Sequence, residues 1–228
     1  MKKYLVIVNF EREDFYIDKE NIKYLDYKRL LVIPNSELDK LLEGYDGLVL
    51  SGGPQHLPYF DNYPELLKEI YLINFAIKRN LIILGICLGF QLINHYFGNV
   101  VTTLEKCVVG CNKINTETFN NYDDEILKKI DINLLSQGFS FHYDGVKNNL
   151  TKDLLVIAND FNNNVYFVKH KNLPIYGIQL HPEAEYYEIK KCLKKYKVYQ
   201  NIYLPNDEIL KQIREHFFMV ILGINNIF

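Results

Sequence analysis

The feature that most constrains the fold is an apolar strand that runs into a glycine-flanked cysteine and then into an apolar helix. The predicted strand covers residues 81–84, and the turn after it reads Gly85-Ile-Cys-Leu-Gly-Phe-Gln91. A glycine on each side of Cys87 is typical of a strand-to-helix turn so sharp that neighbouring backbone segments touch. Such a turn belongs to a βα unit and raises the cysteine at the edge of a sheet.

The rest of the chain repeats this alternation of strand and helix. Short apolar runs separated by helical patterns indicate βα units around a parallel sheet. The predicted strands of the first half are residues 4–9, 30–33, 47–50 and 81–84, and its predicted helices are residues 37–42 and 65–78. After Gly98 the strands become shorter, which indicates a more antiparallel or mixed second half of the sheet. These strands are residues 99–102, 107–114, 154–158, 164–169 and 175–179, and a final amphipathic helix is predicted over residues 207–221.

Composition narrows the classes of function. The chain is 48 % hydrophobic over 228 residues, which supports one domain over residues 1–228, with a divergent C-terminal segment at 184–228. A formal charge of −2, with lysines spread along the chain, does not indicate a nucleic-acid partner. The longest apolar run near the end, residues 217–223, is too short to span a bilayer, so no membrane partner is predicted. The four cysteines include no C-x-x-C pair, so no metal site is predicted and a reduced, cytoplasmic setting fits best.

Two further segments place glycine or polar residues at the carboxyl ends of predicted strands. The first, Gly47-Leu-Val-Leu-Ser-Gly-Gly-Pro54, ends in glycines whose N–H groups can face a small anion, as an oxyanion hole requires. The second ends in His181-Pro-Glu183, where a histidine and a carboxylate can serve as base and orienting acceptor for a cysteine nucleophile. Taken singly, each motif also has a structural interpretation, such as a core cysteine between packing glycines. Together they favour a cysteine-dependent site, because open α/β sheets place their sites at these strand ends.

These three segments resemble, in order and spacing, the signature blocks of class I glutamine amidotransferases. The blocks are Ser51-Gly-Gly-Pro54, Gly85-Ile-Cys-Leu-Gly-Phe-Gln91 and His181-Pro-Glu183, and the likeness runs from Tyr4 to about Glu183. The resemblance implies a flavodoxin-like fold of the amidotransferase type, with a mostly parallel central sheet flanked by helices. It implies neither a metal nor an organic cofactor.

The resemblance also implies a role for each matching residue. Cys87 would attack the glutamine amide and form a glutamyl thioester with release of ammonia. His181 would act as base and then as acid, and Glu183 would orient it. The N–H groups of Gly53 and Leu88 would hold the oxyanion. The residues implied in substrate binding are Gln91, Gly52, Gln55, Phe141, Tyr143 and Asp144, the last three through main-chain groups that hold the amino-acid end of the substrate. His142, in the same stretch, is implied as a structural residue.

Three hypotheses for the function remain open at this point. The first is a subunit that hydrolyses L-glutamine and passes ammonia to a separate synthase, as family members usually do. The second is a stand-alone hydrolase of γ-glutamyl amide bonds in small metabolites or peptides. The third is a regulatory module that keeps the fold without catalysis. We also expect residues 184–206, a longer stretch than a compact amidotransferase needs, to cover the site or to pack against a partner.

Overall fold

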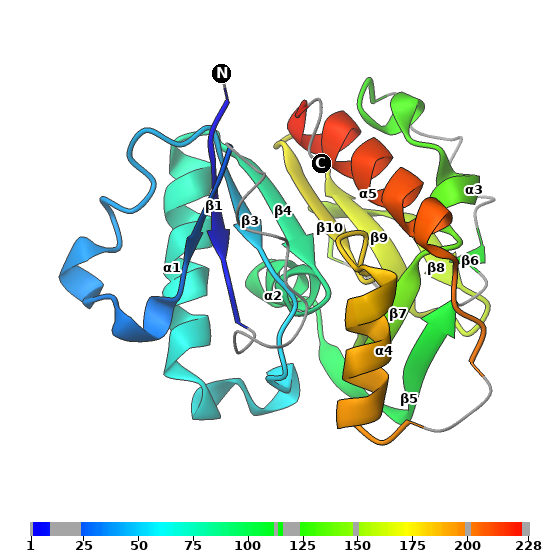
Figure 1. The fold of residues 1–228 in the computed structure, drawn as a ribbon. Helices are drawn as coiled ribbons and strands as arrows, with labels where there is room; N and C mark the ends of the chain where they lie inside the picture. The colour runs from blue at the N-terminus through cyan, green and yellow to red at the C-terminus, as the bar shows by residue number, and fades with distance from the viewer. Residues whose placement is uncertain are drawn as a thin grey trace.

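The structure is a computed structural model that describes residues 2–9, 24–111, 114–115, 124–147, 151–198 and 202–224. Its centre is an eight-stranded sheet in the order β2-β1-β3-β4-β10-β9-β8-β6 (Figure 1). The first five of these are parallel and comprise β2 (Leu25–Lys28), β1 (Tyr4–Ile7), β3 (Gly47–Leu50), β4 (Ile82–Ile86) and β10 (Ile175–Ile178). The last three join antiparallel to their neighbours and comprise β9 (Val165–His170), β8 (Leu154–Asp160) and β6 (Ile114–Asn115). The expected mostly parallel sheet with a mixed second half is confirmed.

A second, two-stranded antiparallel sheet pairs β5 (Val101–Cys111) with β7 (Phe139–Val146). The predicted strands at 99–102 and 107–114 correspond to the single strand β5 and, at Ile114, to the start of β6. No strand is predicted from the sequence at β7. This strand carries several of the implied substrate-binding residues and contacts the end of β10 through a bridge between Phe139 and His181.

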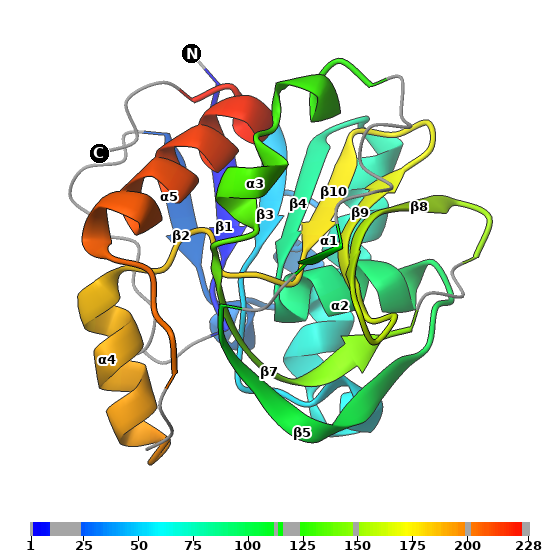
Figure 2. The ribbon, with the colours of Figure 1, turned by 90° about the vertical axis from the view of Figure 1, so that its right-hand side faces the viewer.

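Helices cover both faces of the large sheet (Figures 1 and 2). The helices α1 (Pro64–Lys78) and α2 (Leu88–Tyr96) pack on one face, and α5 (Asp207–Leu222) packs on the other. Strand β1 shows the division, because Leu5 and Ile7 belong to the cluster with α1 and α2, whereas Tyr4 and Val6 belong to the cluster with α5. Burial on both faces explains why the central strands are continuous apolar runs.

The smaller helical elements lie at the ends of the strands. They are α3 (Ile132–Leu135), α4 (Tyr186–Lys195) and short 3-10 helices at Leu30–Val32, Asn35–Glu37, Leu57–Asn62 and Leu127–Lys129. Among the described residues, no helix combines the length and the apolar character needed to cross a membrane.

Two predicted elements of the first half are wrong. The apolar run at 30–33 forms a 3-10 helix, and the edge strand lies earlier, at β2. Only Leu30 of this helix is buried, and the Lys68 ammonium donates hydrogen bonds to the Leu30 and Ile33 carbonyls, which ties the segment to α1. The predicted helix at 37–42 consists of turns after a 3-10 helix that ends at Glu37, because one short segment cannot offset the cost of helix nucleation.

Candidate active site

Cys87 lies at the junction of β4 and α2, in a strained backbone conformation. Its φ is 51° and its ψ is −102°, a region that non-glycine residues rarely adopt. The two flanking glycines are required by contact: a Cβ on Gly85 would clash with the Gly89 carbonyl, and a Cβ on Gly89 would clash with the Leu50 carbonyl. The close backbone contact expected at this turn is therefore present, and it raises the thiol at the carboxyl edge of the sheet.

His181 and Glu183 follow the neighbouring strand β10. The His181 Nδ1 lies 2.8 Å from the Glu183 Oε1, and both residues are buried. Because a carboxylate only accepts, Nδ1 carries the proton and Nε2 is left for the thiol. Burial acts to lower the His181 pKa, but the charge and hydrogen bonds of Cys87 and Glu183 outweigh it and hold this pKa well above its usual value. The site therefore favours a protonated imidazole at His181 beside the Cys87 thiol.

The Gly52-Gly53-Pro54 turn follows β3 and lies against the start of α2. The Gly89 N–H donates to the Ser51 carbonyl at 3.2 Å, and a Cβ on Gly53 would lie 2.6 Å from the Leu88 side chain. Leu88 is the first residue of α2, where a helix leaves its N–H groups without intrahelical partners. Gly53 and Leu88, the two residues expected to form an oxyanion hole, are therefore neighbours.

Gln91 holds β7 against α2. Its side-chain Nε2 donates to the Asp144 carbonyl at 2.9 Å and to the Gln179 Oε1 at 3.1 Å, so both amide hydrogens are used within the protein. His142 shares the Asp144 carbonyl at 2.8 Å, and burial lowers the His142 pKa to about 4. A neutral, buried His142 agrees with the structural role expected for it.

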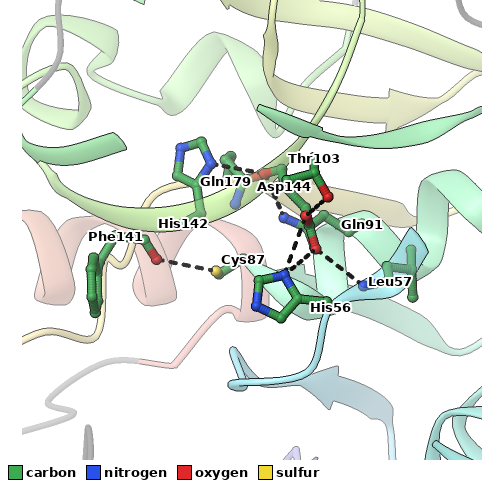
Figure 3. Close-up of polar contacts among 9 residues, drawn as sticks. All are labelled: His56, Leu57, Cys87, Gln91, Thr103, Phe141, His142, Asp144 and Gln179. Carbon is green, nitrogen blue, oxygen red and sulfur yellow. Dashed lines mark hydrogen bonds and ion pairs between the residues drawn. The ribbon is translucent and has the colours of Figure 1, made fainter. Parts of the chain in front are cut away.

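The Asp144 side chain forms a second polar cluster at the pocket (Figure 3). Its carboxylate accepts hydrogen bonds from the Leu57 N–H at 3.1 Å and the Thr103 hydroxyl at 3.0 Å. The His56 Nδ1 lies 3.3 Å from the same carboxylate. Neither His56 nor Thr103 is predicted from the sequence as a site residue. The only available signal for His56 is its position directly after the glycine-rich turn, and Thr103 has none.

A pocket of about 280 Å³ opens above Cys87. Its lining is Gly53, Pro54, Gln55, His56, Cys87, Gln91, Phe141, His142, Tyr143, Asp144, His181 and Tyr196. Tyr196 comes from the end of α4, and its ring contacts the Phe141 ring at a centroid distance of 5.2 Å. One residue of the segment 184–206, Tyr196, therefore borders the pocket, and coverage of the site by the segment as a whole stays a prediction.

Most of the chain matches one family of known proteins. Residues 14–215 match the family described as glutamine amidotransferase class-I. The chain belongs to this family.

Named relatives and solved structures agree with that assignment. A GMP synthase (glutamine-hydrolyzing) of Ehrlichia ruminantium is 31 % identical over 92 % of this chain, although the match spans only 40 % of that protein. One subunit of the GMP synthase (glutamine-hydrolyzing) of Sulfurisphaera tokodaii is 27 % identical over 81 % of this chain and 91 % of its own length. The crystal structure of a glutamine amidotransferase from Thermotoga maritima shares the fold, with a TM-score of 0.65, 19 % identity and coverage of 96 % and 98 % of the two chains.

Within this amidotransferase, the implied site residues divide into those that line the pocket and those that do not, namely Gly52, Leu88 and Glu183. Most of those that the sequence predicts line the pocket directly, including Cys87, His181 and Gln91. Glu183 lies behind His181 and contacts it. Gln55 borders the pocket, but its amide nitrogen donates to the Glu65 carboxylate at 3.1 Å, so that part of its side chain is bound to α1.

Proposed function

We propose that this amidotransferase hydrolyses the side-chain amide of L-glutamine to glutamate and ammonia through a triad of Cys87, His181 and Glu183. The observation that carries the proposal is the strained Cys87 beside a buried His181–Glu183 pair joined at 2.8 Å. A strained nucleophile at a strand-to-helix turn, with an oriented base next to it, is the arrangement that acyl transfer to a thiol requires.

The chemistry follows from these positions. The Cys87 thiolate attacks the amide carbon, and the resulting oxyanion is held by the N–H groups of Gly53 and Leu88. His181 then gives its proton to the departing nitrogen, so ammonia leaves and a glutamyl thioester remains. A water molecule attacks the thioester, His181 takes its proton, and glutamate leaves as the thiolate is restored. Glu183 keeps the imidazole in the tautomer and orientation that both steps need.

The ammonia is proposed to serve a separate synthase. The support comes from the Sulfurisphaera relative, which this chain matches over 91 % of its length and which is named as one subunit of a glutamine-hydrolyzing GMP synthase. The Ehrlichia relative is more than twice as long as the matched region. A partner chain that accepts ammonia would supply the corresponding activity here.

Hydrolysis of other γ-glutamyl amides is the second candidate. It is favoured by the aromatic border of the pocket, where Phe141, Tyr143 and Tyr196 offer apolar surface for a substituent on the amide nitrogen. A non-catalytic module is the least consistent hypothesis, because nothing in such a role requires the strained Cys87 beside a buried base.

The deciding experiment measures release of ammonia and glutamate from L-glutamine and from a panel of γ-glutamyl amides. Cys87→Ala should lower the rate of turnover at least about 1000-fold, because it removes the nucleophile. Cys111→Ala, on β5 and outside the pocket lining, is the matched control and should remain active. A diazoketone analogue of glutamine should label the nucleophile covalently, and peptide mass spectrometry then identifies the labelled residue. This test needs no partner protein. Turnover that survives in Cys87→Ala, or a label on another residue, would exclude the proposed nucleophile.

A further inference from the structure

The turn after β3 contains one side chain that the proposed chemistry does not use, the Ser51 hydroxyl. Ser51 directly follows β3 and does not line the pocket. Its Oγ accepts a hydrogen bond from the Asn9 N–H at 3.1 Å and donates to the Gly52 carbonyl at 2.8 Å. Because an N–H can only donate and a carbonyl can only accept, the single proton of the hydroxyl is directed to Gly52.

The bond to the Gly52 carbonyl fixes the orientation of a whole peptide group. The Gly52 carbonyl and the Gly53 N–H belong to the same planar, trans peptide, so they point in opposite directions. Holding the carbonyl at Ser51 therefore turns the Gly53 N–H away from Ser51. In the described part of the chain this N–H donates to no backbone carbonyl, and Gly53 lines the pocket. The N–H thus remains available to an oxyanion.

The peptide between Gly52 and Gly53 is freer to turn over than most peptides. Such a turn changes ψ of the first residue and φ of the second by about 180°, which side chains resist because it takes most residues out of the allowed backbone regions. Glycine has no side chain, so a glycine on each side removes that barrier. Neither glycine has a left-handed φ in this structure. The observed orientation therefore depends on the hydrogen bond at the carbonyl.

Ser51 is itself fixed to two neighbouring elements. Its N–H donates to the Ile7 carbonyl of β1 at 3.0 Å, and its carbonyl accepts from the Gly89 N–H of α2 at 3.2 Å. The helix α2 begins directly after Cys87. The hydroxyl therefore holds the peptide in a defined position relative to the nucleophile.

We infer that Ser51 is a positioning residue, whose hydroxyl orients the Gly52–Gly53 peptide so that the Gly53 N–H meets the oxyanion. The inference rests on the proposed function and adds one residue to it. Because the oxyanion forms only during the reaction, this orientation should contribute to turnover and not to substrate binding.

The test removes the hydroxyl with Ser51→Ala. The substrate is L-glutamine or, if it is hydrolysed faster, the best γ-glutamyl amide of the panel. The variant should lower kcat about 5- to 100-fold, the effect of leaving a carbonyl without its partner, up to the loss of an oxyanion donor. Binding of the same substrate, measured by titration calorimetry in a Cys87→Ala background, should change less than about twofold.

Two further variants serve as controls for Ser51→Ala. Ser51→Thr keeps the hydroxyl and should keep kcat within about threefold of that of the unsubstituted protein. Ser136→Ala removes another hydroxyl that donates to a backbone carbonyl at 2.8 Å, but outside the pocket lining, and should leave kcat unchanged.

Alkylation of Cys87 by iodoacetamide separates orientation of the peptide from general damage to the site. In this reaction the sulfur forms a bond to carbon, iodide leaves, and no oxyanion develops. Ser51→Ala should therefore leave the alkylation rate of Cys87 and its pH dependence unchanged while it lowers kcat. Peptide mass spectrometry over time measures the rate at Cys87 itself.

The outcomes distinguish the inference from the proposed function. An unchanged kcat in Ser51→Ala, or a parallel fall in kcat and in the alkylation rate, would overturn the role of Ser51 and leave the proposed function intact. Absence of turnover of every substrate by the unsubstituted protein would overturn the proposed function, and the inference with it.

Discussion

Burial alters the pKa of Glu69 on α1, a residue outside the pocket lining. Glu69 is completely buried, and burial, reinforced by nearby Glu65, raises its pKa to about 8. A pKa of about 8 keeps this buried carboxyl mostly protonated at neutral pH.

This raised pKa predicts a specific dependence of stability on pH. The unfolded chain releases the Glu69 proton near pH 4.5 and the folded chain near pH 8, so this residue lowers the free energy of unfolding progressively as pH rises between these values. Glu69→Gln removes the titration and should raise stability at pH 8 by roughly 2 to 4 kcal/mol relative to its effect at pH 4.5. Urea denaturation of both proteins at the two pH values measures this. A parallel pH dependence in the variant would contradict the assignment.

At the scale of elements, α4 shapes the pocket from outside the central sheet. The helix begins with a capping box between Glu185 and Glu188, and it is anchored by the buried side chains of Ile189 and Cys192. These anchors hold Tyr196, at the end of the helix, over Phe141. We therefore interpret α4 as a fixed wall.

Truncating Tyr196, the residue at the end of α4 that borders the pocket, should alter substrate preference. Tyr196→Ala should raise kcat/KM for γ-glutamyl anilides relative to L-glutamine by about 3- to 10-fold, because it widens the pocket border by one aromatic ring. Tyr187→Ala, on the same helix but 75 % exposed, is the matched control and should leave the ratio unchanged. A fall in the ratio would instead mean that Tyr196 binds the aromatic substituent.

Elements with strong local patterns could be predicted from the sequence, and elements defined by distant partners could not. The run at 47–50 matches β3, and the helix after Pro64 is present as α1. Strand β7 was not predicted, because Phe139–Val146 mixes buried polar and apolar residues, and its place depends on pairing with β5 and on Gln91. The same holds for the site: Cys87 and His181 lie in sequence motifs, whereas His56 becomes a site residue only through its contact with Asp144, far along the chain.

At the scale of the whole molecule, binding of the proposed synthase partner should change the rate of L-glutamine hydrolysis. An amidotransferase whose ammonia is consumed elsewhere loses glutamine needlessly if it is fully active alone. Adding the partner synthase with its substrates should therefore raise L-glutamine hydrolysis, by about 5- to 150-fold for a coupling of typical size. Steady-state ammonia release with and without the partner measures this, and an unchanged rate would favour the stand-alone hydrolase.

The position of β10 links the assembly of the sheet to the onset of activity. This strand inserts between β4, which leads to Cys87, and β9, and the Cys87 N–H donates to the Ile178 carbonyl at 2.8 Å. His181 comes directly after it in the chain. During synthesis on the ribosome, Cys87 is made long before His181, and the thiol does not have the His181 imidazole beside it until β10 takes its place. Activation of Cys87 by His181 therefore depends on the last parallel strand to be synthesised. A nascent or misfolded chain in which β10 is not in place carries a thiol without this base.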